Sequence, residues 1–193
     1  MNFEIILVFI YSYFLGSIPF GLIITKFFLK KDIRKVGSGN IGTTNVLRTG
    51  QKSLAIATLI FDILKGYVSV LIALKYFNDL IYFSALICFI GHIFPAWLKF
   101  KGGKGVATYL GVILGLSLNF GIIFVITWLL ISSIFKYSSL ASMVGSLIVF
   151  AYSINLDNAI LSVFLFVTFV IILYTHRENI VRLKESKETK IKL

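Results

Sequence analysis

A series of long apolar stretches constrains the fold of this 193-residue chain more than any other feature. The stretches cover residues 3–25, 53–74, 80–98, 106–134, 139–153 and 159–174. A helix of about 20 apolar residues crosses the hydrocarbon core of a bilayer. Charged residues make up only 14% of the chain, against about 25% in soluble domains. The sequence therefore predicts an all-α integral membrane protein.

The first stretch begins close to residue 1. It lacks the basic residues that open a cleaved signal peptide, and its apolar run is too long for one. We interpret it as the first spanning helix. Pro19-Phe-Gly21 interrupts this helix, and membranes tolerate a kink there when neighbouring helices cover the freed carbonyl.

The stretch 106–134 is too long for one ordinary span. It contains Ser117-Leu-Asn119, which is typical of a tight turn. Basic loops face the cytoplasm, so Lys104 before the stretch and Lys136 after it should lie on the same side of the membrane. That requires two short spans here, and about seven spans in total.

The distribution of basic residues predicts the orientation. With the N-terminus outside, the cytoplasmic loops and the C-terminal tail receive all but two of the 19 Lys and Arg residues, the exceptions being Lys65 and Lys75. The net charge of +11 is then mostly a topology signal, and nucleic-acid binding is the weaker interpretation because no basic soluble domain exists to carry it. We find no repeat or linker and expect residues 1–193 to form a single polytopic membrane domain.

The first polar segment of interest is GSGNIGTTNVLR, residues 37–48. It satisfies the G-x-G-x-x-G pattern, but its position between two predicted spans excludes a βαβ unit, and Thr43-Thr44 replace the Lys-Ser/Thr of a P-loop. Its glycines allow backbone N–H groups to converge on an anion, and Arg48 adds a guanidinium suited to phosphate. An ordinary cytoplasmic turn is the alternative interpretation.

A second glycine segment, KFKGGKG at residues 99–105, leads directly into the apolar run that begins at Val106. Adjacent glycines, lysines and a helix N-terminus together form an anion site. Lysines that merely anchor a helix end are the alternative. Lysines alone would anchor a helix end, however, and the glycines are not needed for that because they destabilise a helix.

The third segment is the exit of the last span, YTHRENIVR at residues 174–182. His176, Asn179 and Arg182 lie at i, i+3 and i+6, so a continued helix places them near one face. His176 is a candidate base near neutral pH, or else a simple interfacial side chain. Three phosphate-suited segments at one membrane face predict an anionic substrate handled where lipid meets cytosol.

Five further polar residues lie in or beside the predicted spans. Asp62 and Lys65, at i and i+3 inside the second span, form either a structural ion pair or a substrate contact. His92 is either a hydrogen-bonded core histidine or a catalytic one. Ser139 and Ser142 either cap the sixth span or offer hydroxyl groups to phosphate.

These segments, in this order, resemble the bacterial acyl-phosphate–glycerol-3-phosphate acyltransferase family (PlsY). GSGNIGTTNVLR is similar to its first signature, GHIFPAWLKFKGGKGVAT (91–108) to its second and HRENIVRL (176–183) to its third. The resemblance implies a seven-helix bacterial inner-membrane enzyme whose active site faces the cytoplasm. It implies acyl transfer from acyl phosphate to the 1-hydroxyl of glycerol 3-phosphate, giving lysophosphatidic acid and phosphate. It also implies no metal or other cofactor, membrane lipid as surroundings, and a functional link to an acyl-phosphate-forming enzyme.

The resemblance further implies a set of site residues. Both substrates carry phosphate, so two anion sites are needed, and KGGKG resembles the glycerol 3-phosphate element. The hydroxyl proton goes either to His176 or to a substrate phosphate oxygen. The predicted catalytic residues are Ser38, Arg48, Lys104 and His176. The predicted substrate-binding residues are Gly37, Gly39, Asn40, Gly42, Thr43, Asn45, Lys101, Gly102, Gly103, Gly105, Thr108, Ser142 and Asn179.

A membrane transporter of organic phosphates is the alternative function. It would also use intramembrane charges and broken helices. Against it, most ionisable residues gather at one predicted face instead of along a pathway, and only Asp62 and Lys65 lie mid-span. A purely structural membrane subunit is a third alternative.

Overall fold

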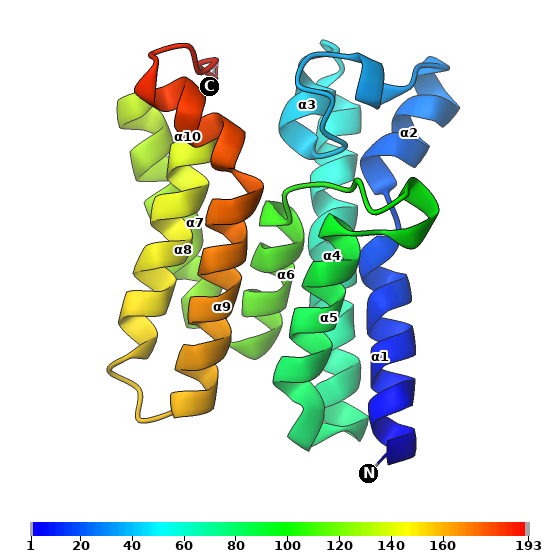
Figure 1. Cartoon of the computed structure of the whole chain (residues 1–193), viewed down its shortest axis with the longest axis vertical. Helices are drawn as coiled ribbons and strands as arrows, with labels where there is room; N and C mark the ends of the chain where they lie inside the picture. The colour runs from blue at the N-terminus through cyan, green and yellow to red at the C-terminus, as the bar shows by residue number, and fades with distance from the viewer. Residues whose placement is uncertain (1, 192–193) are drawn as a thin grey trace. The chain divides into compact units, whose positions relative to one another are not determined.

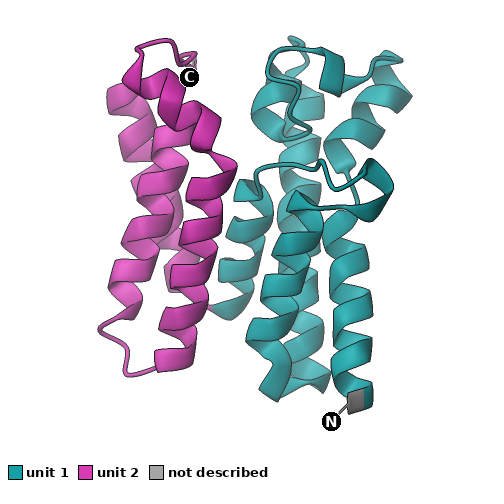
Figure 2. Ribbon diagram, viewed as in Figure 1, with its two compact units in different colours: residues 1–116 teal, residues 117–193 magenta. Residues whose placement is uncertain are grey.

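The computed structural model describes residues 2–191 as helices joined by turns and short loops (Figure 1). Lys192, one of the basic residues of the tail, lies outside the described residues. The chain divides into two compact units, residues 1–116 and 117–193 (Figure 2). The all-α fold class is confirmed for residues 2–191, and the single membrane domain stays a prediction.

Unit 1 is built around one long helix. Its helices are α1 (Asn2–Ser17), α2 (Phe20–Leu29), α3 (Thr43–Leu47), α4 (Lys52–Tyr76), α5 (Ile81–Ile93) and α6 (Val106–Leu116), with 3₁₀ turns η1 (Ile33–Lys35), η2 (Asn78–Leu80) and η3 (Ala96–Leu98). The central helix α4 packs against each of the other five α-helices. Its approach to α6 depends on glycine, because a Cβ on Gly66 or Gly111 would overlap with the facing backbone.

The first apolar stretch forms two helices with a break at Ile18 and Pro19. The break exposes backbone carbonyls that a continuous helix would satisfy. Trp97 Nε1 donates to the carbonyl oxygen of Ser17 at 2.9 Å, and Lys65 Nζ donates to that of Ile18 at 2.7 Å. The predicted kink, with its freed carbonyls covered by neighbouring segments, is therefore confirmed.

Unit 2 consists of α7 (Leu118–Phe135), α8 (Ser138–Ser153), α9 (Ala159–Thr175) and α10 (Arg177–Lys184). Helix α8 packs against both α7 and α9. The predicted division of the stretch 106–134 is confirmed, because α6 ends at Leu116 and α7 begins at Leu118. Ser117 lies between them with extended backbone, and its hydroxyl accepts the N–H of Asn119 at 3.3 Å.

Several segments are long and apolar enough to cross a membrane. Within residues 2–191, four meet this condition by themselves: Phe3–Leu29, Lys52–Tyr76, Asn78–Leu98 and Leu118–Phe135. Helices α9 and α10 together make a fifth, although they meet at a bend of 60°. The apolar helices α6 and α8 are shorter. Seven crossings and their orientation remain predictions.

Candidate active site

The first glycine segment is held in shape by the side chain of Asn45, which is 2% exposed. Its Nδ2 donates to the carbonyl oxygens of Ile33 at 3.1 Å, Val36 at 2.9 Å and Asn40 at 2.8 Å. Its Oδ1 accepts the N–H of Ser38 at 3.1 Å. The amide of Asn45 thus serves the loop itself, which sequence patterns did not indicate.

Gly37 and Gly39 have positive φ angles of 54° and 71°, which L side chains rarely adopt. A Cβ on Gly37 would also lie 2.5 Å from Asn45 Oδ1 and 3.0 Å from Arg48 Cδ. The absence of a side chain at position 37 therefore lets Arg48 lie directly against the loop. The Arg48 residue itself is exposed.

The expected convergence of backbone N–H groups on an anion is wrong for three residues of this loop. Their N–H groups donate within the loop: Ser38 to Asn45 Oδ1 at 3.1 Å, Gly39 to the Val36 carbonyl at 3.0 Å and Gly42 to Asn40 Oδ1 at 2.8 Å. A tight loop must satisfy its own buried backbone groups before it can bind a ligand. Arg48 is the one charged side chain within residues 37–48, so it stays the predicted anion-binding residue of this loop.

The chain enters the second glycine segment from the end of α5, which lies beside the middle of α4. His92, in the last turn of α5, is hydrogen-bonded to Lys65, which lies 13 residues, or about 20 Å, along α4. The N–H groups of Gly102 and Gly103 donate to the carbonyl oxygens of Ile93 at 3.0 Å and His92 at 3.1 Å. These two N–H groups satisfy carbonyl groups at the end of α5 and are not directed at an anion. The predicted anion site is therefore wrong for these two groups.

What remains for an anion at the second segment is the start of α6. Gly105 has φ of 85°, and its carbonyl accepts the N–H of Tyr109 at 2.7 Å, which begins the helix. The N–H groups of the first helical turn have no partner within their own helix. Lys104, half-buried, immediately precedes this turn, and Lys101 is exposed.

A buried threonine hydroxyl lies within the first glycine segment, and another lies three residues after the second. Thr43 Oγ1 and Thr108 Oγ1 are buried and have no hydrogen-bond partner among the described residues. Buried hydroxyl groups are usually hydrogen-bonded, so these two are exceptions that need a reason. Direct contact with a substrate is a reason that suits both predicted binding residues.

An apolar cluster brings the first two signatures together. Ile33, Ile41 and Val46 of the first loop region pack with Leu22 and Ala55, and Leu98 of the second signature packs against this cluster. The first and second signatures thus pack on the same apolar cluster in unit 1. The third signature belongs to unit 2.

His176 lies at the junction of α9 and α10 and is 3% exposed. The continued straight helix expected from the sequence is wrong, because the two helices meet at 60°. The Nδ1 atom of His176 lies 2.8 Å from the carbonyl oxygen of Ile172. A carbonyl only accepts, so Nδ1 carries the hydrogen and Nε2 of the neutral ring carries the lone pair. This tautomer suits a general base.

Asn179 donates through Nδ2 to Glu188 Oε1. The same carboxylate accepts hydrogen bonds from Ser139 Oγ and Arg182 Nε, both at 2.8 Å. Partial burial would raise the pKa of Glu188, but hydrogen bonds from Arg182, Asn179 and Ser139 outweigh it and hold the pKa below its ordinary value. Glu188 therefore ties the tail to α8 and α10. Glu188 is one of three acidic residues in the basic tail, with Glu178 and Glu185, so local composition does not single it out for this role.

Ser142 donates its hydroxyl hydrogen to the carbonyl of Ser138 at 2.8 Å and accepts from Trp128 Nε1 at 3.2 Å. Its single hydrogen is therefore used within α8. Neither Ser142 nor Ser139 caps α8, whose N-cap Tyr137 makes no side-chain cap hydrogen bond. The capping interpretation is wrong for both serines.

Comparison with known proteins decides the family. A protein-family model described as glycerol-3-phosphate acyltransferase matches residues 6–186. The chain belongs to this family. A glycerol-3-phosphate acyltransferase from Pelagibacter ubique (strain HTCC1062) is 54% identical over 190 residues, covering 98% of this chain and 99% of the relative. One from Brucella anthropi is 48% identical over 182 residues, covering 94% of this chain and 90% of the relative.

Solved structures of the glycerol-3-phosphate acyltransferase family agree with this assignment. PlsY, described as an integral membrane glycerol 3-phosphate acyltransferase, is 36% identical and covers 98% of this chain. Its glycerol 3-phosphate form matches with a TM-score of 0.93, and its lysophosphatidic acid form with 0.90. The predicted family resemblance and the integral membrane class are both confirmed.

Proposed function

We propose that this chain transfers an acyl group from acyl phosphate to the 1-hydroxyl of glycerol 3-phosphate. The observation that carries the proposal is the family match over residues 6–186, which includes all three signatures. The two glycine segments and their cationic residues support it, because both substrates present phosphate groups. Lysophosphatidic acid and phosphate are the products.

The reaction needs one bond to form and one to break. The 1-hydroxyl oxygen of glycerol 3-phosphate attacks the acyl carbon, and the bond from that carbon to the phosphate oxygen breaks. The hydroxyl proton goes either to His176 or to a substrate phosphate oxygen. Arg48 and Lys104 stabilise the phosphate charges, so catalysis rests on positioning and electrostatics.

We assign two kinds of role to the predicted site residues. Ser38, Thr43, Thr108, Arg48 and Lys104 contact substrate. Residues whose polar groups are used within the protein have a supporting role instead: Gly39, Asn40, Gly42, Asn45, Gly102 and Gly103 in unit 1, and Ser142 and Asn179 in unit 2. Gly37 leaves space for the side chain of Arg48. Gly105 begins α6, and Lys101 adds positive charge to the same segment.

The donor is a first prediction. Acyl phosphate should support turnover by the purified protein with glycerol 3-phosphate, because the site offers phosphate-binding groups and no feature suited to the nucleotide of coenzyme A. Lysophosphatidic acid formation, measured with acyl phosphate and acyl-coenzyme A in parallel, checks this. Equal turnover with acyl-coenzyme A would contradict the donor assignment. Uptake of organic phosphate into vesicles without any acyl transfer would favour the transporter alternative.

Topology is a second prediction. We propose seven crossings of the bacterial inner membrane, an external N-terminus and an active site at the cytoplasmic face beside an acyl-phosphate-forming enzyme. A membrane-impermeant thiol reagent applied to intact cells should label single cysteines at positions 78 and 157, but not at 186. Cys88 is buried, so the unmodified chain gives the background. The reverse labelling pattern would overturn the orientation.

A further inference from the structure

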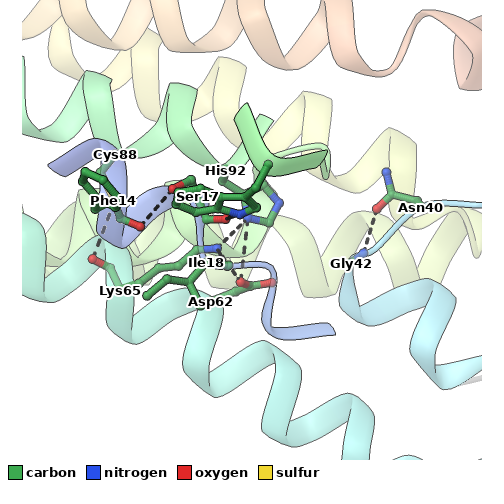
Figure 3. A network of polar contacts seen from close by, with 10 residues as sticks. Phe14, Ser17, Ile18, Asn40, Gly42, Asp62, Lys65, Cys88 and His92 are labelled. Atoms are coloured by element: carbon green, nitrogen blue, oxygen red, sulfur yellow. Dashed lines mark hydrogen bonds and ion pairs between the residues drawn. The ribbon is translucent and has the colours of Figure 1, made fainter. Parts of the chain in front are cut away.

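A buried charged network lies in the middle of α4 (Figure 3). Lys65 Nζ is 2.7 Å from Asp62 Oδ1 and 2.9 Å from His92 Nδ1. The three side chains are at most 4% exposed. The ion-pair interpretation of Asp62 and Lys65 is thus confirmed, and His92 joins the pair.

Stability alone does not account for this network. Replacing a buried ion pair by apolar residues of similar size is often neutral or stabilising. Ionisable groups within membrane spans are costly, and their usual justification is functional.

Lys65 connects the break in the first span to α4 and α5. Its ammonium donates to the freed carbonyl of Ile18 at 2.7 Å and lies 5.7 Å from the centroid of the Phe20 ring. Because an ammonium only donates, His92 Nδ1 accepts in the remaining bond. The orientation of the imidazole is therefore set by Lys65.

His92 in turn limits where the second glycine segment can lie. A Cβ on Gly103 would overlap with His92 Nε2, so the backbone at Gly103 rests against this edge of the ring. The N–H of Gly103 also donates to the His92 carbonyl at 3.1 Å. A change in the position of His92 would consequently move the segment that leads to Lys104 and the first turn of α6.

We propose that Asp62, Lys65 and His92 are positioning residues for glycerol 3-phosphate. They hold the second glycine segment so that Lys104 and the start of α6 meet the phosphate of this substrate. The proposal rests on the proposed function, together with the family resemblance by which KGGKG is the glycerol 3-phosphate element. The network itself contacts neither substrate.

The first test removes both charges together. In Asp62→Leu/Lys65→Met no buried charge is left unpaired, so the variant is expected to fold. The KM for glycerol 3-phosphate should rise about tenfold, as for loss of a charge-assisted hydrogen bond, whereas kcat and the KM for acyl phosphate change less than about threefold. The matched control is Thr58→Val, also buried on α4, because among the described residues its hydroxyl bonds only to the Leu54 carbonyl of its own helix. The control should leave both KM values unchanged.

The second test separates the hydrogen bond from simple packing. His92→Asn keeps an acceptor for Lys65 but loses volume, whereas His92→Leu keeps volume and has no acceptor. If the bond to Lys65 positions the segment, the leucine variant should have the higher KM for glycerol 3-phosphate, by about fivefold. The opposite order would show that the ring acts by packing and would overturn the proposal.

Gly103→Ala separates failure of this proposal from failure of the proposed function. If Gly103→Ala selectively raises the KM for glycerol 3-phosphate while the network variants do not, the positioning role is wrong and the assignment of the segment stands. If Gly103→Ala shifts both KM values equally, the segment does not bind glycerol 3-phosphate, and the assignment on which the proposal rests is wrong.

Discussion

Arg48→Ala and Lys104→Ala are each expected to lower kcat/KM by about 10–100-fold, because a hydrogen bond to a charged group is worth about 1.5–3 kcal/mol. Arg48 ends α3 and lies against Gly37, where its guanidinium can reach an anion at the first loop. Lys104 is half-buried two residues before the start of α6 at Val106. Steady-state kinetics of the purified variants measure both effects.

Arg48→Lys and Lys52→Ala complete this experiment. Lysine keeps the charge at position 48 but loses the planar fork that binds phosphate in two places, so Arg48→Lys should recover only part of the activity. Lys52 is exposed at the start of α4, near the same loop, and has no assigned role in the site. Lys52→Ala therefore measures the effect of losing a positive charge alone. This variant should retain kcat/KM within about twofold. Near-normal kinetics of Arg48→Ala or Lys104→Ala would reduce that residue to a topology anchor.

Gly103→Ala should raise the KM for glycerol 3-phosphate by about tenfold or more and that for acyl phosphate much less, because a one-methyl overlap displaces the segment. The added methyl would overlap with His92 Nε2, and Lys65 holds that ring in place. The φ angle of Gly103 is not positive, so lost space and not backbone strain is the cause. This separates Gly103 from Gly105, whose φ is 85°.

Gly50→Ala is the matched control. Gly50 has φ of 84° in a loop next to α4, and a Cβ there would meet nothing within 4 Å. Its variant therefore carries backbone strain without overlap, and both KM values should stay unchanged. Each substrate is varied separately on proteins matched for thermal stability. Equal shifts of both KM values in Gly103→Ala would mean that the two loops do not divide the substrates as proposed.

The sequence by itself determined most of the helices of this protein. The stretch 53–74 became α4, 139–153 became α8 and 159–174 became α9, each within a few residues. The division at Ser117 and the pairing of Asp62 with Lys65 were equally readable. These features are local, since the length of an apolar run and the i, i+3 spacing act within one turn or one helix.

Only the tertiary structure decided how the polar groups are used. The spacing of glycines predicted N–H groups aimed at an anion, yet those of Gly39, Gly102 and Gly103 are used by the backbone of nearby residues. The bend at His176 and the role of Glu188 were likewise outside the reach of local patterns. Lys65 illustrates the reason, because its partners Ile18 and His92 are 47 and 27 residues away in sequence. A buried donor takes whichever acceptor the packed fold presents, and that choice is made only after the helices have come together.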